Sequence, residues 1–134
     1  MNIVIDANII FAALIKDSKT AEIILNKNIT LYTPEFVLLE IEKHKKEILE
    51  KTSRSKEELE QILNILKYII KIIPQTEIEQ YLAQSRKITP DPNDIMYIAL
   101  ALKLKCAIWS NDKVLATQNQ IKVHNTAEII KLLE

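Results

Sequence analysis

The stretch NIVIDAN, residues 2–8, decides the fold class, because a short run of β-branched apolar residues ends abruptly in an aspartate. Such a run is typical of a strand buried on both faces of a parallel sheet. Three later segments are also expected to be strands: TLYT (30–33), CAIWS (106–110) and IKVHN (121–125). The first strand then delivers Asp6 to the carboxyl edge of the sheet.

Segments with helical periodicity separate these strands. Helices are expected around residues 20–27, from Pro34 to 51, at 59–73, at 76–87, from Asp94 onward, and at 127–134. The residues KIIP (71–74) are also compatible with a brief strand. The alternation of strands and helices predicts an α/β fold with a mostly parallel sheet and helices on both faces.

Three residue pairs predict where helices begin. A capping residue followed three positions later by glutamate occurs at Ser55 with Glu58, Thr76 with Glu79, and Asn125 with Glu128. The chain contains no glycine, so left-handed turns are expected to use asparagine, with Asn26, Asn28 and Asn119 as candidates. The same absence excludes a Walker A loop and a Rossmann fingerprint, which need glycine close to phosphate.

The composition predicts one domain over residues 1–134, since 134 residues with 48% hydrophobic content suffice for one core. No long uncharged apolar run and no signal-peptide pattern is present, so a cytoplasmic protein without membrane association is expected. The single cysteine, Cys106, is expected to be a small core residue. Lysine and arginine (18) balance aspartate and glutamate (18), so net charge does not identify a partner.

Four carboxylates are expected to meet at one edge of the sheet. Asp6 and Asp112 follow strands, and Asp94 opens a helix that enters from the same edge. Glu40 lies among apolar residues of a helix that starts there. Such a group would raise its own pKa values unless a cation lay between its members, and oxygen-only ligands favour Mg²⁺ or Mn²⁺. The expected chemistry is hydrolysis of a phosphodiester, in which the ion binds the phosphate and activates a water.

Each acid also has a purely structural interpretation. Asp6 and Asp91 suit helix caps, and Asp112 suits a turn. Glu40 is spaced to pair with Lys43 or His44, and His44 is expected on a solvated basic helix face.

Other candidate residues surround these acids. Ser110 and Asn111 are expected to shape the turn before Asp112, with a possible role in holding water or phosphate, and Trp109 is expected to be core. The low-ranking candidates for RNA contacts are Lys43, Lys45, Lys46, Arg86 and Lys87. The apolar stretch 59–73 has more than one apolar stripe, which predicts a homodimer.

At this point the chain resembles the PIN-domain ribonucleases, over essentially its whole length. The matching segments, in order, are IVIDAN, LYTPEFVLLEIEKHK, DPNDIMYIALALKLK and CAIWSNDK. The resemblance implies a three-layer α/β/α sandwich and an acid cluster that binds Mg²⁺ or Mn²⁺ to cleave single-stranded RNA. Carried over position by position, Asp6, Glu40, Asp94 and Asp112 match the four acids, with Asp91 as a further candidate ligand.

The sequence departs from the family pattern at two places. Ala7 stands where a threonine or serine is frequent, although Asn8 remains as an auxiliary residue, and the acidic loop reads Asp91-Pro92-Asn93-Asp94. Small stand-alone members are often toxins of toxin-antitoxin pairs, which implies a small antitoxin partner. The alternatives are a catalytically silent PIN-like module that binds RNA or protein, and a structure-specific DNA nuclease, which would usually carry added DNA-binding elements.

Overall fold

The computed structural model describes residues 1–15 and 18–134. The strands in these ranges are β1 (Asn2–Ile5), β2 (Thr30–Pro34), β3 (Lys71–Ile73), β4 (Ala107–Trp109) and β5 (Val123–His124). The α-helices are α1 (Ala7–Ile15), α2 (Ser18–Ile24), α3 (Phe36–Lys51), α4 (Lys56–Ile69), α5 (Gln75–Ile78), α6 (Leu82–Ile88), α7 (Ile95–Leu104) and α8 (Thr126–Leu133). Short 3-10 turns are η1 (Glu79–Tyr81), η2 (Pro92–Asp94) and η3 (Leu115–Thr117).

The five described strands form one sheet in the order β3-β2-β1-β4-β5, and every pairing is parallel. β1 lies in the middle, with Ile3 paired to Leu31 on one side and to Ala107 on the other. Ile3 and Ile5 are at most 1% exposed, which explains why the strand carries no polar alternation. The prediction of an α/β fold with a parallel sheet is confirmed.

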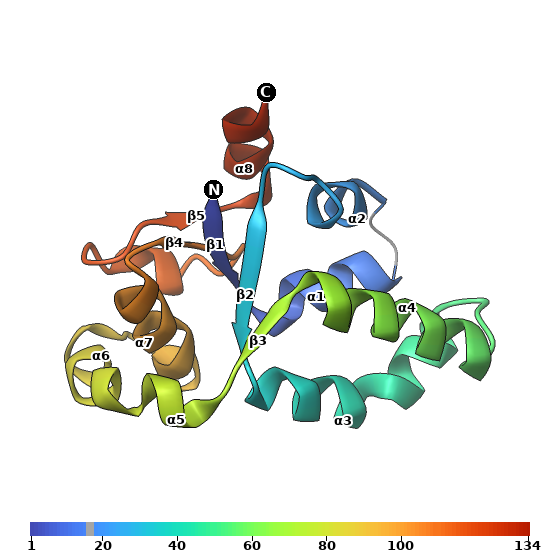
Figure 1. Cartoon of the computed structure of the whole chain (residues 1–134), viewed down its shortest axis with the longest axis horizontal. Helices are drawn as coiled ribbons and strands as arrows, with labels where there is room; N and C mark the ends of the chain where they lie inside the picture. Colours follow the sequence, from blue (N-terminus) through green and yellow to red (C-terminus); the bar gives the residue numbers. More distant parts are fainter. Residues whose placement is uncertain (16–17) are drawn as a thin grey trace.

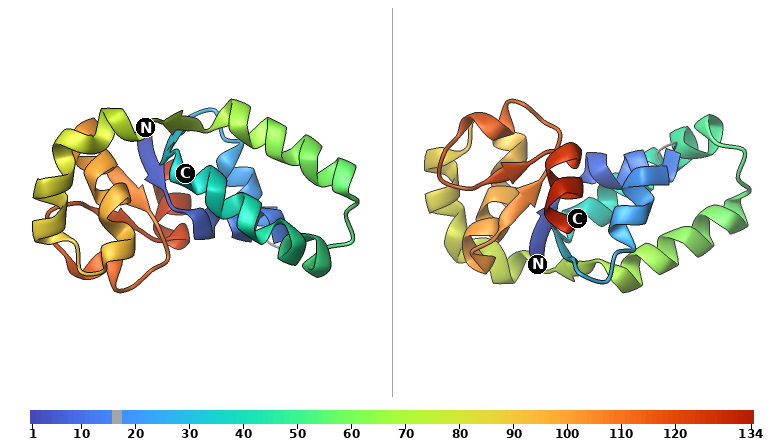
Figure 2. Two further views of the ribbon diagram at one scale, coloured as in Figure 1. Left: turned by 90° about the horizontal axis from the view of Figure 1, so that it is seen from below. Right: turned by 90° about the horizontal axis from the view of Figure 1, so that it is seen from above.

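Helices cover both faces of this sheet and complete a three-layer arrangement. Helices α5, α6 and α7 lie on one side, and α1 and α2 on the other (Figure 1). Helices α3 and α4 form a long pair that extends away from the sheet, as both views in Figure 2 show. The carboxyl ends of β1 and β4 therefore open toward the space between α7, α1 and α3.

Helix α7 is apolar on most of its surface because it is enclosed between the sheet and its neighbours. Ile98, Ala99, Leu100 and Ala101 are 0% exposed. An all-apolar helix suits either a protein core or a bilayer. α7 has only 10 residues, and none of the helices in the described ranges is long and apolar enough to cross a membrane.

Several expected boundaries are confirmed and others are wrong. The capping boxes at Ser55 and Asn125 are both present, and 71–73 is a strand. Pro34 does not begin a helix, since it is the last residue of β2 and pairs with Ile73. β1 and β2 pair only as far as Val4 and Tyr32, so the missing N–H of Pro34 leaves no ladder bond unmade.

The helix expected at 76–87 is divided into α5, η1 and α6, and it does not begin at Thr76. Pro74 is the N-cap residue of α5, and the first N–H, from Gln75, donates to the Glu35 carboxylate at 2.8 Å. The cap therefore comes from a distant segment, which a local pattern cannot reveal. Helix α1 was also not anticipated, because its sequence ANIIFAALI lacks the polar residues that mark a helical period.

The expectation that asparagines adopt left-handed turns is wrong. Lys105 is the only described residue with positive φ, at 53°, and it ends α7. Asn26, Asn28 and Asn119 are therefore not in the left-handed region. Asn26 instead uses its side chain, whose Oδ1 accepts from the N–H of Asn28 at 2.8 Å.

Candidate active site

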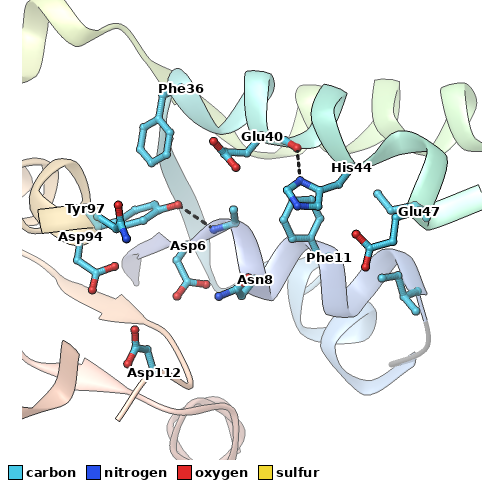
Figure 3. Close-up of a pocket in the computed structure, with 14 residues that line it drawn as sticks. Asp6, Asn8, Phe11, Phe36, Glu40, His44, Glu47, Asp94, Tyr97 and Asp112 are labelled. Carbon is cyan, nitrogen blue, oxygen red and sulfur yellow. Dashed lines mark hydrogen bonds between the residues drawn. The ribbon is translucent and has the colours of Figure 1, made fainter. Parts of the chain in front are cut away.

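A cleft of about 640 Å³ opens beyond the carboxyl ends of β1 and β4 (Figure 3). All four predicted acids line it, namely Asp6, Glu40, Asp94 and Asp112. The other lining residues are Ala7, Asn8, Phe11, Ile15, Phe36, His44, Glu47, Ile48, Asn93 and Tyr97. We call the part around Asp6, Asp94 and Asp112 the acid end, and the part formed by Phe11, Ile15, His44, Glu47 and Ile48 the arm.

Asp6 is held in place by both of its carboxylate oxygens. Oδ1 accepts the N–H of Ile9 at 3.0 Å, so Asp6 caps the start of α1, and Oδ2 accepts the hydroxyl of Ser110 at 2.5 Å. The side chain is 6% exposed. Burial raises its pKa, the hydrogen bonds from Ser110 and Ile9 oppose that rise, and the nearby Asp112 carboxylate adds to it. The structural role expected for Asp6 is thus present beside the predicted catalytic one.

Ser110 joins two of the acids. Its hydroxyl donates to Asp6 and accepts the N–H of Asp112 at 3.1 Å. Asp112 Oδ1 in turn accepts the N–H groups of Val114 and Leu115, at 2.8 and 3.3 Å, so it also shapes the turn into η3. Ser110 is 2% exposed. It therefore acts as a bridge that sets Asp6 and Asp112 relative to each other.

Asp94 differs from the other acids because its carboxylate has no structural bond. It occupies the N-cap position of α7 without a side-chain cap, and its Oδ2 is buried with no hydrogen-bond partner among the described residues. Burial, followed by repulsion from Asp112, Asp91 and Asp6, raises the pKa of Asp94 to about 6. A buried oxygen without a partner is costly in a folded protein, so Asp94 is the strongest candidate ligand among the four acids.

Glu40 lies on the opposite side of the cleft, on α3 (Figure 3). Its Oε1 accepts from Lys43 Nζ at 3.4 Å, and its side chain is 34% exposed. The ion pair that was the alternative interpretation of Glu40 is therefore present. The side chain still lines the cleft, so the pairing does not remove it from the site.

The remaining auxiliary residues are not all in the cleft. Asn8 lines it, whereas Asp91 does not, and Asp91 Oδ1 accepts the N–H of Asn93 at 3.0 Å as the cap of η2. Asn111 faces α8, where its side chain donates to Thr126 Oγ1 at 3.1 Å and accepts from Thr126 N at 2.9 Å. Trp109 is fully buried, as expected.

None of the basic residues proposed for RNA contacts lines the cleft. Lys45 pairs with Glu42 at 2.8 Å and with Glu60 at 2.6 Å, which ties α3 to α4. Lys46, Arg86 and Lys87 are exposed. Of the residues that the structure describes, no lysine or arginine is among those lining the cleft.

The sequence analysis did not identify most of the other lining residues, among them His44, Glu47 and Tyr97. His44 is half-buried against Phe11, with ring centroids 4.9 Å apart, so its expected place on a solvated basic face is wrong. The hydroxyl of Tyr97 accepts the N–H of Ala7 at 3.0 Å and lies beside Asp6 and Asp94. Helical spacing contained the signal, because His44 and Glu47 follow Glu40 by four and seven positions and Tyr97 follows Asp94 by three.

The residues at the acid end fit a hard divalent cation. Their donors are carboxylate oxygens, one of them buried and without a partner, and no positive side chain among the described lining residues offsets their charge. Within the described ranges, no three His, Cys, Asp or Glu side chains form a cluster that could by itself hold an ion. Mg²⁺ does not require one, since it usually keeps several waters and takes only one or two carboxylates.

Comparison with known proteins agrees with this architecture. The sequence profile of the PIN domain matches residues 4–132. A crystal structure of VapBC2 from Rickettsia felis, bound to a DNA fragment from their promoter, has a chain that is 19% identical, with a TM-score of 0.71 over 93% of this chain and 98% of that one. A chain of a toxin-antitoxin complex from Klebsiella pneumoniae is 13% identical to this chain. Its TM-score is 0.67, and the match covers 92% of this chain and 97% of that one. No curated protein matches the sequence.

The profile match covers nearly the whole chain, including β1 with Asp6, α3 with Glu40, the start of α7 with Asp94 and the turn with Asp112. The two solved structures share the fold at low identity. The described strands form the parallel sheet that the segment order in the sequence predicted. The chain belongs to the PIN domain family.

Proposed function

We propose that this chain is a divalent-metal-dependent endoribonuclease that hydrolyses phosphodiester bonds of single-stranded RNA, with Mg²⁺ or Mn²⁺ as its ion. The observation that carries the proposal is the buried Oδ2 of Asp94, which has no partner among the described residues. It faces a cleft with other carboxylates and, in the described part of the chain, without a lysine or arginine. An RNA phosphate would be repelled from such a cleft unless a cation were present.

The four acids divide into two groups in this proposal. Asp94 would bind the ion directly through its unpartnered oxygen, and Asp6 and Asp112 at the acid end and Glu40 on α3 would face the ion through its bound waters. When bound, the ion would polarise the scissile phosphodiester and offset the charge that develops on its oxygens. Ser110 keeps Asp6 and Asp112 at a set separation through its two hydrogen bonds. Asn8 and Asn93 line the cleft and supply neutral amide donors for phosphate oxygens.

Cleavage of a single-stranded RNA pool tests the proposal. We expect products with Mn²⁺ or Mg²⁺, no products with a chelator, and loss of cleavage in Asp6→Asn. A matched control is Asp91→Asn, because Asp91 lies outside the cleft lining and asparagine also caps helices. Cleavage that persists in Asp6→Asn would overturn the proposal.

One observation favours the silent-module alternative. Asp6 and Asp112 both have structural bonds, to the N–H of Ile9 and to the N–H groups that begin η3. These bonds alone would explain two of the acids. The alternative expects RNA or protein binding without cleavage and no saturable Mn²⁺ binding. Isothermal titration of Mn²⁺ into the wild type therefore separates the two functions.

We also propose that a small antitoxin binds this chain, because the structure from Klebsiella pneumoniae that shares its fold is a toxin-antitoxin complex. An apolar groove of about 260 Å³ between α1, α2 and α4 offers a surface for it. Leu25 and Ile65 line this groove and are 60% and 53% exposed. In co-purification with the protein encoded beside it, Leu25→Glu should abolish the complex. The control Leu39→Glu, at a 67% exposed position on α3, should not.

The expected homodimer remains a proposal of the same kind. Tyr68 on α4 is 91% exposed, and Ile65, one helical turn before it, is 53% exposed. Contiguous exposed apolar surface marks protein interfaces. We expect light scattering to report a dimer for the purified chain and a monomer for Tyr68→Glu. An unchanged mass would show that α4 does not form the contact.

A further inference from the structure

The arm of the cleft is not explained by the binding of an ion. It leads away from the acid end between α1 and α3, with Phe11 and His44 midway and Glu47 at the far side (Figure 3). The rings of Phe11 and His44 lie at 45° to each other with centroids 4.9 Å apart, and Ile15 and Ile48 add aliphatic surface. Aromatic side chains and histidine of this kind are the surfaces on which single-stranded bases stack.

The tautomer of His44 follows from its hydrogen bond. Nδ1 lies 2.8 Å from the carbonyl oxygen of Glu40, and a carbonyl can only accept, so Nδ1 carries the hydrogen. In the neutral ring Nε2 is then an acceptor. Glu47, one helical turn further along α3, supplies carboxylate oxygens that also only accept, although one of them is paired with Lys51 at 2.7 Å.

The charges of the arm select for a neutral part of a substrate. Glu47 lines it, and none of the described residues of the arm is a lysine or arginine. A phosphate would be repelled by the Glu47 carboxylate, which already occupies the neighbouring Lys51. A nucleobase, by contrast, would stack on the Phe11 ring and donate N–H groups, in the plane of the base, to His44 Nε2 and to Glu47.

We propose that the arm is a base-binding subsite for the nucleoside next to the scissile phosphate, and that His44 and Glu47 favour bases with an exocyclic amino group over uracil. This inference rests on the proposed ribonuclease function for the position of the phosphate. The subsite itself requires only the cavity, the aromatic pair and the two acceptors. The arm would then set which bond the enzyme cuts, while the acid end cuts it.

Cytidine and uridine are suitable probes, because both are neutral and they differ at the edge that the arm would read. Each is titrated into the chain in the presence of a chelator, and binding is followed by the NMR shifts of the His44 ring and of Ile48. We expect cytidine to bind about 5-fold more tightly than uridine, as expected for a net gain of one hydrogen bond. Glu47→Gln should reduce this preference, because an amide presents a donor as well as an acceptor.

Substitutions at His44 separate its ring nitrogens. His44→Asn retains a donor near Nδ1 for the Glu40 carbonyl but removes Nε2, whereas His44→Gln places a polar atom near Nε2. We expect cytidine affinity to fall about 5-fold in His44→Asn and His44→Ala, and to be largely retained in His44→Gln. The control Glu50→Ala, at an exposed position of α3 outside the cleft, should bind as the wild type does.

The outcomes distinguish the subsite from the nuclease. Equal affinity for both nucleosides, no saturable binding of either, or no effect of His44→Ala would overturn the subsite, even if RNA is cleaved. Binding of cytidine that depends on His44, in a chain that neither binds Mn²⁺ nor cleaves RNA, would support the subsite and overturn the nuclease. In an active enzyme, His44→Ala should change the distribution of cut sites without changing Mn²⁺ affinity.

Discussion

At the acid end of the cleft the carboxylates lie just beyond strands or open a helix, with Asp6 and Asp94 buried and Asp112 half-buried, whereas the arm is lined by side chains from helix surfaces. Asp6 and Asp94 are 6% and 8% exposed, and burial is the largest cause of their raised pKa values. In the arm, Glu47 is exposed and its pKa is lowered by its hydrogen bond from Lys51. The ionised form of a carboxylate is therefore costly at the acid end and well tolerated in the arm.

This difference predicts how strongly each region responds to substitution. Where a carboxylate is desolvated and lacks a partner, a single change alters the electrostatics of the whole site. Where a charge lies at the surface, water replaces a lost partner at little cost. Four predictions follow this order, from the acid end to the arm.

The largest effect is expected for Asp94→Asn. Loss of one buried carboxylate should lower Mn²⁺ affinity and RNA cleavage by more than about 100-fold, since even residues that only support a metal ligand contribute about 10–100-fold. Calorimetry and a gel-based cleavage assay measure the two effects. Asp91→Asn, outside the cleft lining, is the matched control and should change both by little. Similar losses in the two variants would show that Mn²⁺ binding and cleavage do not depend on the carboxylate of Asp94 in particular.

The second prediction concerns pH and stability without metal. The pKa of Asp94 is about 6 in the folded chain against a reference value of 3.8. Below about pH 3 the group is protonated in both states and costs nothing. As pH rises from about 3 to 6, the unfolded chain loses this proton first, so the free energy of unfolding falls, by about 1–3 kcal/mol from this group.

Asp94→Asn should remove that loss, so the variant should be more stable than the wild type at pH 7 and equally stable at about pH 3. Urea unfolding with a chelator at both values measures the difference. A variant that is less stable at pH 7 would mean that the carboxylate has a favourable partner after all. Protons should also compete with Mn²⁺ for this site, so wild-type affinity should weaken below pH 6.

The third prediction concerns the bridge between the acids. Ser110→Ala removes the hydroxyl that donates to Asp6 and accepts from Asp112 N. We expect a loss of about 1–3 kcal/mol in the free energy of unfolding, as for a buried hydrogen bond whose partners are left unpaired, together with a further rise in the pKa of Asp6. NMR titration of the carboxyl carbons measures that pKa. The exposed Ser53→Ala is the control and should leave both quantities unchanged.

The smallest effect is expected in the arm. Lys51→Ala breaks the 2.7 Å pair with Glu47, whose two side chains are 55% and 48% exposed. Because solvent and salt screen such pairs, we expect no measurable change in Tm or in Mn²⁺ affinity. Differential scanning fluorimetry at low and high salt checks this. A clear loss of stability would show that the arm is electrostatically coupled to the fold.

Much of this site was predictable because its acids are placed by local rules. An aspartate after a buried β-branched run must lie at the carboxyl edge of a parallel sheet, as Asp6 does, and an aspartate before an apolar helix opens that helix, as Asp94 does. The capping boxes at Ser55 and Asn125 were equally local. The resemblance to PIN-domain proteins rested on segments that lie almost entirely within the range of the profile match, residues 4–132.

The residues that escaped prediction are those whose surroundings come from distant segments. Glu35 caps α5 across 40 positions of sequence, and Pro34 fits a strand only because β1 ends before it. His44 looks like part of a solvated basic helix until α1 brings Phe11 against it. Asp91 and Asp94 are similar in sequence, yet one caps a turn and the other faces the cleft.

Local sequence patterns specify the class of fold, the strand ends that carry acids, and membership in the family, because hydrophobic periodicity and capping act within a few residues. Three features arise only from the packing of distant segments: the buried oxygen of Asp94 without a partner in the described chain, the bridge from Asp6 through Ser110 to Asp112, and the aromatic arm that continues the cleft. The desolvation of a side chain and its contacts depend on which distant segments pack against it, and the residues next to it in the sequence do not reveal those segments.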